Sequence, residues 1–124
     1  MTIRKIRNSN KECALIESED IVISDAQSAL ELLMNTKYEA GTKNIVISKE
    51  SINEDFFVLS TGLAGEILQK YINYGGRIAI YGDFSGYTSR PLRDFIHESN
   101  KGTDVFFAAT IEEAICRLTC NQDS

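Results

Sequence analysis

Two hydroxyl residues and a glycine, Ser60-Thr61-Gly62, stand directly before a stretch with helical periodicity. The first turn of a helix has unpaired N–H groups and a partial positive charge, so it attracts anions and side-chain oxygens. Ser60 or Thr61 therefore either caps the helix or accepts a phosphoryl group, which would add about two negative charges beside a favourable dipole. Gly62 either eases the turn or lets a ligand approach the backbone. Capping is the commoner use of such hydroxyls.

A second group of polar residues lies at 82–90, GDFSGYTSR, and consists of Asp83, Ser85, Tyr87, Thr88, Ser89 and Arg90. An arginine among hydroxyls near a helix start could hold a phosphate or a carboxylate. The alternative is a structural turn, because Gly, Asp and Ser favour turns and Ser89 or Thr88 can cap the following helix. Both interpretations stay open on these residues.

The residues that most often catalyse reactions or bind metals lack partners at recognisable spacing. His97 is the only histidine, and it falls within a predicted helix next to Ile96 and Glu98. Nucleophilic catalysis needs a base within reach, so a small hydrolase using Ser60 or Ser85 is the least favoured function. A zinc site would need more ligands than the chain's three cysteines and one histidine offer at these spacings: Cys13, Cys116, Cys120 and His97. We expect no metal, no cofactor and no catalysis.

Composition sets broad limits on what the chain can do. Its 124 residues, 43% hydrophobic and 25% charged, suit one globular domain with a proper core. A net charge of −5 argues against a general nucleic-acid binder, which needs a basic surface. No apolar run approaches the roughly 20 residues of a membrane span, and the N-terminus does not read as a signal peptide. We expect a cytoplasmic protein that binds neither nucleic acid nor membranes.

The elements that position these residues follow from hydrophobic periodicity and capping signals. An N-terminal hairpin is predicted within residues 1–20, and Ser24 with Gln27 has the pattern of a capping box for a helix that ends at Gly41. Apolar runs predict strands at 44–48, 77–82 and 105–108. Further helices are predicted to begin near Thr61, Pro91 and Thr110, and residues 119–124 to form a frayed tail.

This order predicts one α/β domain over residues 1–124: an N-terminal β-hairpin, then alternating helices and strands. About five strands would form a mixed, mostly parallel sheet with about four helices. Ligands of such sheets bind outside the carboxyl ends of the strands, which selects the loops 48–61 and 82–90.

The sequence of residues 56–102 resembles an uncharacterised bacterial family, catalogued as domain of unknown function 4180. The resemblance rests on two long patterns, TGLAGEILQK and YGDF-x-x-YTS-x-x-LRDFI, and implies no established activity. The order of elements also resembles a STAS domain, the fold of bacterial anti-sigma-factor antagonists. Ser60-Thr61-Gly62-Leu63, Gly75-Gly76 and RIAIYG fall into that family's order, which would make Thr61 the phosphoacceptor. Leu59 stands where that family usually has an aspartate.

Two adjacent phenylalanines, Phe56 and Phe57, lie in the acidic loop before Ser60. In an extended loop their side chains point to opposite sides, so we expect one of them, taken as Phe57, to be an exposed docking contact.

Together these features predict a non-catalytic regulatory or binding module. It would engage a regulatory partner protein through the loops 54–62 and 82–90, with Thr61 or Ser60 as phosphoacceptor. The alternative is a small-anion or nucleotide sensor that uses Arg90 and the loop hydroxyls.

Overall fold

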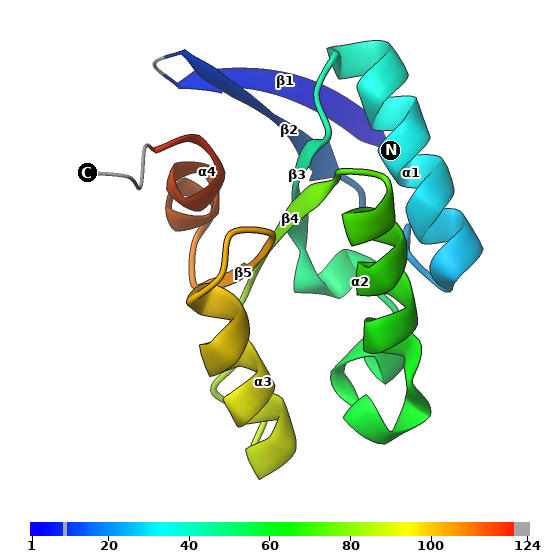
Figure 1. Cartoon of the computed structure of the whole chain (residues 1–124), viewed down its shortest axis with the longest axis vertical. Coiled ribbons are helices and arrows are strands. Elements are labelled where there is room, and N and C mark those ends of the chain that lie inside the picture. Colours follow the sequence, from blue (N-terminus) through cyan, green and yellow to red (C-terminus); the bar gives the residue numbers. More distant parts are fainter. Residues whose placement is uncertain (9, 121–124) are drawn as a thin grey trace.

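The predicted N-terminal hairpin forms from β1 (Thr2–Asn8) and β2 (Lys11–Glu17), which pair antiparallel with Thr2 opposite Glu17. The computed structural model describes residues 1–8 and 10–120. Three parallel strands extend the sheet in chain order, so that its five strands run β1-β2-β3-β4-β5 (Figure 1). Their bounds are Asn44–Ser48 for β3, Arg77–Tyr81 for β4 and Val105–Ala108 for β5. The expected mixed, mostly parallel sheet is confirmed.

In the described residues, four α-helices cover the two faces of the sheet: α1 (Ala26–Ala40), α2 (Leu63–Asn73), α3 (Arg90–Asn100) and α4 (Ile111–Thr119). Successive residues of a strand point to opposite faces of the sheet, so each strand contributes side chains to two hydrophobic cores. On β3, Ile45 and Ile47 pack in the core that includes residues of α1, α2 and α3, whereas Val46 packs in the core that includes residues of α4. Figure 1 shows α4 away from the other helices.

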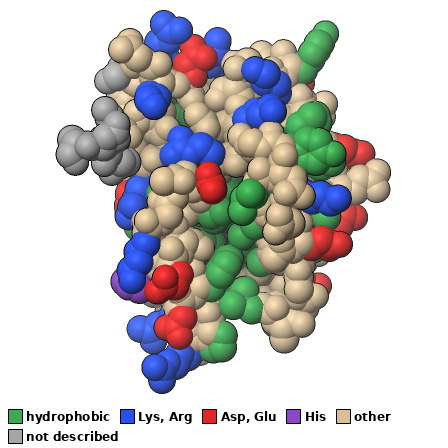
Figure 2. Space-filling view, in the orientation of Figure 1, with side chains coloured by type: hydrophobic (Ala, Val, Ile, Leu, Met, Phe, Trp, Pro, Cys, Tyr) green, Lys and Arg blue, Asp and Glu red, His purple; other side chains and the backbone are tan. Residues whose placement is uncertain are grey.

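Hydrophobic side chains also gather on the outside between α2 and α3 (Figure 2). Leu68 and Ile72 of α2 and Phe95 of α3 line a hollow of about 320 Å³ there. Within residues 1–8 and 10–120, no helix is long and apolar enough to cross a membrane.

The helix ends mostly follow the predicted signals. Gly41 ends α1 with φ 72°, a left-handed conformation that glycine adopts without strain. The predicted start of α1 is wrong by one residue. Asp25, and not Ser24, is the N-cap, and its carboxylate accepts from the N–H of Ser28 at 2.8 Å while the Ser28 hydroxyl accepts from the N–H of Asp25 at 3.0 Å. The hydroxyl of Thr110 caps α4 as expected, accepting from the N–H of Glu113 at 3.1 Å.

The segment after β3 is not an irregular loop but a chain of three short 3₁₀-helices: η1 (Lys49–Ser51), η2 (Glu54–Phe57) and η3 (Leu59–Thr61). This geometry overturns the expectation that Phe57 is exposed. Phe56 and Phe57 are only 1% and 3% exposed. In a 3₁₀-helix consecutive side chains are about 120° apart rather than on opposite sides, so both rings can turn inward.

The expected frayed tail does not begin at 119. Thr119 is the last residue of α4 and is buried, with its hydroxyl donating to the carbonyl of Ile115 at 2.6 Å. Cys120 is the C-cap of α4, and residues 121–124 lie outside the described residues.

Candidate functional site

The two loops selected from the sequence meet at the carboxyl end of the sheet. β3 and β4 are adjacent and parallel, so the segments that follow them emerge side by side. The hydroxyl of Tyr87 donates to the carboxylate of Glu54 at 2.9 Å. The Tyr87 ring also stacks on Phe57, with centroids 5.2 Å apart and planes 19° apart. The loops 54–62 and 82–90 therefore form one continuous surface.

Lys49 lies beside Tyr87 at this junction. Its ammonium lies 5.2 Å from the centroid of the Tyr87 ring and 3.2 Å from the carboxylate of Glu50. Burial alone would lower the pKa of Lys49, but the hydrogen bond to Glu50 and the proximity of Tyr87 raise it overall, so the group stays charged. Gly82 makes room for this side chain, because a Cβ there would lie 2.7 Å from the Lys49 chain.

A groove of about 410 Å³ runs between the two loops. Six of its lining residues have largely apolar side chains: Phe57, Val58, Leu59, Tyr87, Pro91 and Leu92. Hydroxyl groups of Ser60, Thr88 and Ser89 line it as well. Val58 is 47% exposed, which is high for a large apolar side chain. The groove can accept an apolar group while offering hydrogen bonds to its neighbours.

Thr61 and Ser60 have different surroundings, although both are exposed. The Thr61 hydroxyl lies 2.8 Å from the carbonyl oxygen of Asp55 and 2.9 Å from that of Val58, and donates its proton to these acceptors. The same oxygen accepts from the N–H of Leu63 at 3.2 Å, so it ties η2 and η3 to the start of α2. Ser60 makes no side-chain hydrogen bond to any described residue, and it lines the groove.

Gly62 has a structural role at the start of α2. It is the N-cap residue of this helix and has φ 79°, a left-handed conformation in which a side chain would be strained. Its N–H donates to the carbonyl of Leu59 at 3.1 Å and closes η3.

Residues 8–118 match a family model described as Domain of unknown function (DUF4180). The chain belongs to this family. No curated protein and no solved structure matches the chain. The DUF4180 membership predicted from the sequence is confirmed, and the resemblance to STAS domains stays a prediction.

In this DUF4180 domain Asp83 and Ser85 form a turn. The Asp83 carboxylate accepts from the Ser85 hydroxyl at 2.6 Å and from its N–H at 2.9 Å. These hydrogen bonds hold the pKa of Asp83 below its ordinary value, which makes its carboxylate a weak base. His97 lines a separate hollow of about 520 Å³ together with Ser85, but no hydrogen bond joins them among the described residues. Among the described residues, the weakly basic carboxylate of Asp83 is thus the group that accepts from the Ser85 hydroxyl.

Ser89 and Arg90 begin α3. The Ser89 hydroxyl caps the helix by accepting from the N–H of Leu92 at 3.4 Å, as one of the sequence interpretations proposed. The Arg90 side chain is 91% exposed, and its Nε lies 3.8 Å from the carboxylate of Asp94. Arg90 does not line the groove, so the structure does not bring the expected anion-binding arginine to the loop hydroxyls.

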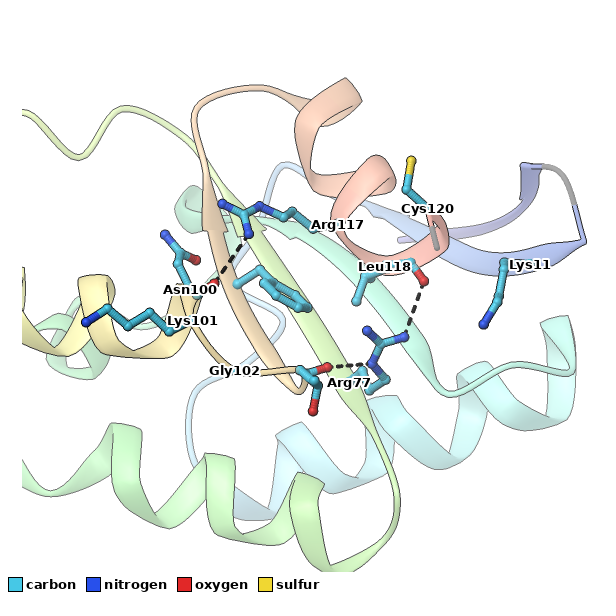
Figure 3. A pocket seen from close by; sticks show the side chains of 10 residues that line it. Lys11, Arg77, Asn100, Lys101, Gly102, Arg117, Leu118 and Cys120 are labelled. Atoms are coloured by element: carbon cyan, nitrogen blue, oxygen red, sulfur yellow. Dashed lines mark hydrogen bonds between the residues drawn. The ribbon is translucent and has the colours of Figure 1, made fainter. Parts of the chain in front are cut away.

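Sequence reasoning missed a basic pocket at the opposite, amino-terminal edge of the sheet. Lys11, Arg77, Lys101 and Arg117 line this hollow of about 520 Å³ (Figure 3). These cations lie in four separate parts of the chain, and no spacing along the sequence links them. Only the arrangement of β2, β4, α3 and α4 reveals their convergence.

Proposed function

We propose that this domain is a non-catalytic binding module whose groove, between residues 54–62 and 82–90, receives a segment of a regulatory partner protein. The observation that carries the proposal is the preformed groove itself. Its walls are joined by the hydrogen bond between Tyr87 and Glu54 and by the stacking of Phe57 on Tyr87. A binding surface that is already ordered avoids part of the entropy cost of association.

The chemistry of the groove suggests what the partner segment contains. Its apolar floor and the exposed Val58 favour insertion of an apolar side chain. Glu54 and Asp55 are exposed at one end, so a basic residue beside that apolar side chain would gain a favourable charge contact. The hydroxyls of the rim would bond to the peptide backbone. We therefore propose an extended segment with one apolar anchor and an adjacent lysine or arginine.

The proposal includes a phosphorylation switch at Ser60 or Thr61, and the hydrogen bonds favour Ser60. A phosphoryl group on Thr61 would disrupt the contacts of its hydroxyl with Asp55 and Val58. Ser60 has no such contacts among the described residues. Modification there would place about two negative charges in the groove without unfolding η3, and would change its affinity for a charged segment.

The alternatives have less support. A small-anion or nucleotide sensor built on Arg90 would need that side chain to converge with the loop hydroxyls, and instead it lies near Asp94. A hydrolase would need a base activated for Ser60 or Ser85. The cytoplasm stays the proposed location on the grounds of the sequence.

The test is a selection of random peptides by display on the purified domain, followed by affinity measurement on two matched variants. Val58→Asp places a charge in the groove. Ile72→Asp makes the same change at a residue of similar exposure, 51% against 47%, on α2 outside the groove. We expect enriched peptides to share an apolar anchor next to a basic residue, and to lose at least about tenfold in affinity with Val58→Asp alone.

Two outcomes would contradict the proposal. One is the absence of any enriched peptide that binds the folded domain. The other is a loss of binding with Ile72→Asp and not with Val58→Asp, which would move the site to the apolar hollow between α2 and α3.

A further inference from the structure

The basic pocket lies at the amino-terminal ends of the strands, opposite the groove at their carboxyl ends. Its cations come from different elements. Arg77 is the first residue of β4, and Lys11 is the first of β2. Lys101 follows α3 directly, and Arg117 lies in the last turn of α4. Figure 3 shows the side chains of Arg77 and Arg117 with Lys11 to one side, whereas the side chain of Lys101 extends away from the two arginines on the other side.

The two arginines are held in place by the backbone around them. The Nε of Arg77 donates to the carbonyl of Thr103 at 2.7 Å, and one of its terminal nitrogens donates to the carbonyl of Leu118 at 3.3 Å. A terminal nitrogen of Arg117 donates to the carbonyl of Asn100 at 3.3 Å. Both guanidinium groups also lie over the ring of Phe106, at 5.8 and 5.5 Å from its centroid. They are thus positioned before any ligand arrives.

These contacts leave donors unused. A guanidinium carries five N–H donors, of which Arg77 uses two and Arg117 one in hydrogen bonds to described residues. Satisfying the carbonyls near the ends of α3 and α4 explains the two arginines. It does not explain why two lysines reach the same hollow. Lys11 forms no ion pair with a described residue, and Lys101 only touches Glu98, at 3.5 Å on the exposed surface.

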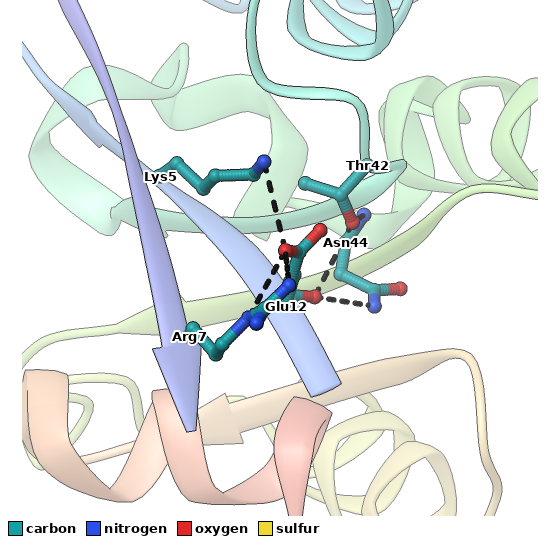
Figure 4. A network of polar contacts seen from close by, with 5 residues as sticks. All are labelled: Lys5, Arg7, Glu12, Thr42 and Asn44. Carbon is teal, nitrogen blue, oxygen red and sulfur yellow. Dashed lines mark hydrogen bonds and ion pairs between the residues drawn. The ribbon is translucent and has the colours of Figure 1, made fainter. Parts of the chain in front are cut away.

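The described part of the pocket's lining holds no counter-ion. Another basic pair, Lys5 and Arg7 on β1, shares the carboxylate of Glu12, at 3.5 and 2.8 Å (Figure 4). None of the described residues that line the basic pocket is acidic. Among the described residues, only Lys101 of these four cations has a carboxylate partner, Glu98 at 3.5 Å on the exposed surface, in a chain whose net charge is −5. Such a local concentration of one charge attracts ions of the opposite charge.

We propose that this pocket binds a small soluble anion that carries two or more phosphate groups. Guanidinium groups bind phosphate oxygens in pairs, and lysines add charge without fixed geometry. Four cations match the charge of a pyrophosphate or a polyphosphate group better than that of a single carboxylate. The volume of about 520 Å³ is that of a small-molecule site. The site is separate from the groove, so either proposal can fail while the other holds.

The test is calorimetric titration of the full chain with inorganic pyrophosphate, at neutral pH and a constant ionic strength of about 0.15 M. Inorganic phosphate and adenosine serve as comparisons that carry one phosphate and none. The double variant Lys11→Gln/Lys101→Gln removes the charges of two exposed lysines. The matched control, Lys37→Gln/Lys70→Gln, removes two exposed lysines from α1 and α2.

We expect saturable binding of one pyrophosphate per chain, weaker binding of phosphate and none of adenosine. The Lys11/Lys101 variant should bind pyrophosphate about tenfold more weakly, while the Lys37/Lys70 control keeps nearly the full affinity. No saturable binding of pyrophosphate would overturn the proposal. So would an equal loss in both variants, because it would show a general effect of charge. Binding to vesicles of an anionic phospholipid that pyrophosphate does not displace would also overturn it, in favour of a membrane surface.

Discussion

Replacing Phe57 by alanine tests whether the wall of the groove is part of the core. The side chain is only 3% exposed. It contacts three other rings, with centroid distances of 5.0 Å to Phe56, 6.0 Å to Phe84 and 5.2 Å to Tyr87. Replacement by alanine would remove the ring and with it these aromatic contacts and the apolar surface that the ring buries.

The expected loss in the free energy of unfolding is about 3 kcal/mol. Phe→Ala changes in cores cost about 3–5 kcal/mol, and aromatic pairs contribute about 0.5–1.5 kcal/mol each beyond burial. The lower end applies because Phe57 borders the groove, where water can fill part of the space that the ring leaves. A domain of this size has a total stability of about 5–15 kcal/mol, so the variant should still fold.

The assay is equilibrium unfolding in urea, followed by circular dichroism, with Val58→Ala as the control. Val58 is the next residue and is 47% exposed, so its truncation should cost less than about 1 kcal/mol. The slope of the free energy of unfolding against urea concentration should stay unchanged for both variants. A loss for Phe57→Ala no larger than for Val58→Ala would refute the reasoning. Such a result would indicate that Phe57 is an exposed contact and not part of the core.

Three further changes test neighbouring parts of the account. Tyr87→Phe removes the hydrogen bond to Glu54 and should cost about 1 kcal/mol in urea unfolding, with little added effect when Glu54→Ala is already present; additive losses would contradict the link. Thr61→Val should cost about 1–2 kcal/mol through its lost backbone bonds, whereas Ser60→Ala should be neutral, and the reverse order would contradict their assigned roles. Burial raises the pKa of the Cys13 thiol from 9.0 to about 11, so the unfolded chain loses its proton first as pH rises. The contribution of this thiol to the free energy of unfolding is fully present below pH 9 and is lost by pH 11, which lowers that free energy by about 2–3 kcal/mol. Cys13→Ala should remove this part of the loss of stability at alkaline pH. An unchanged pH dependence of stability in the variant would contradict the assignment.

Much of the fold could be predicted because local patterns agree with the tertiary structure. The β-branched run of residues 44–48 is buried on both faces of the sheet, as such runs are in parallel sheets. Gly41, Ser89 and Thr110 mark helix ends through glycine conformation and side-chain caps, which act within a few residues. The meeting of the two loops follows from the adjacency of parallel strands.

Features that depend on three-dimensional convergence could not be predicted in this way. Phe57 was misassigned because residues 49–61 form 3₁₀-helices, which no simple periodicity marks in so short a segment. The start of α1 was misplaced by one residue because both Ser24 and Asp25 are good caps, and the box formed with Ser28 decides between them. The basic pocket needs four cations from separate elements, and only the folded chain brings them together.

The central claim is that the groove between residues 54–62 and 82–90 is the binding surface. The most direct measurement is the change in backbone amide chemical shifts of the labelled domain when a display-selected peptide is added. We expect the largest changes around Val58, Ser60 and Tyr87, with little change in the basic pocket. Changes centred instead on Leu68, Ile72 and other residues of the hollow between α2 and α3 would contradict the claim.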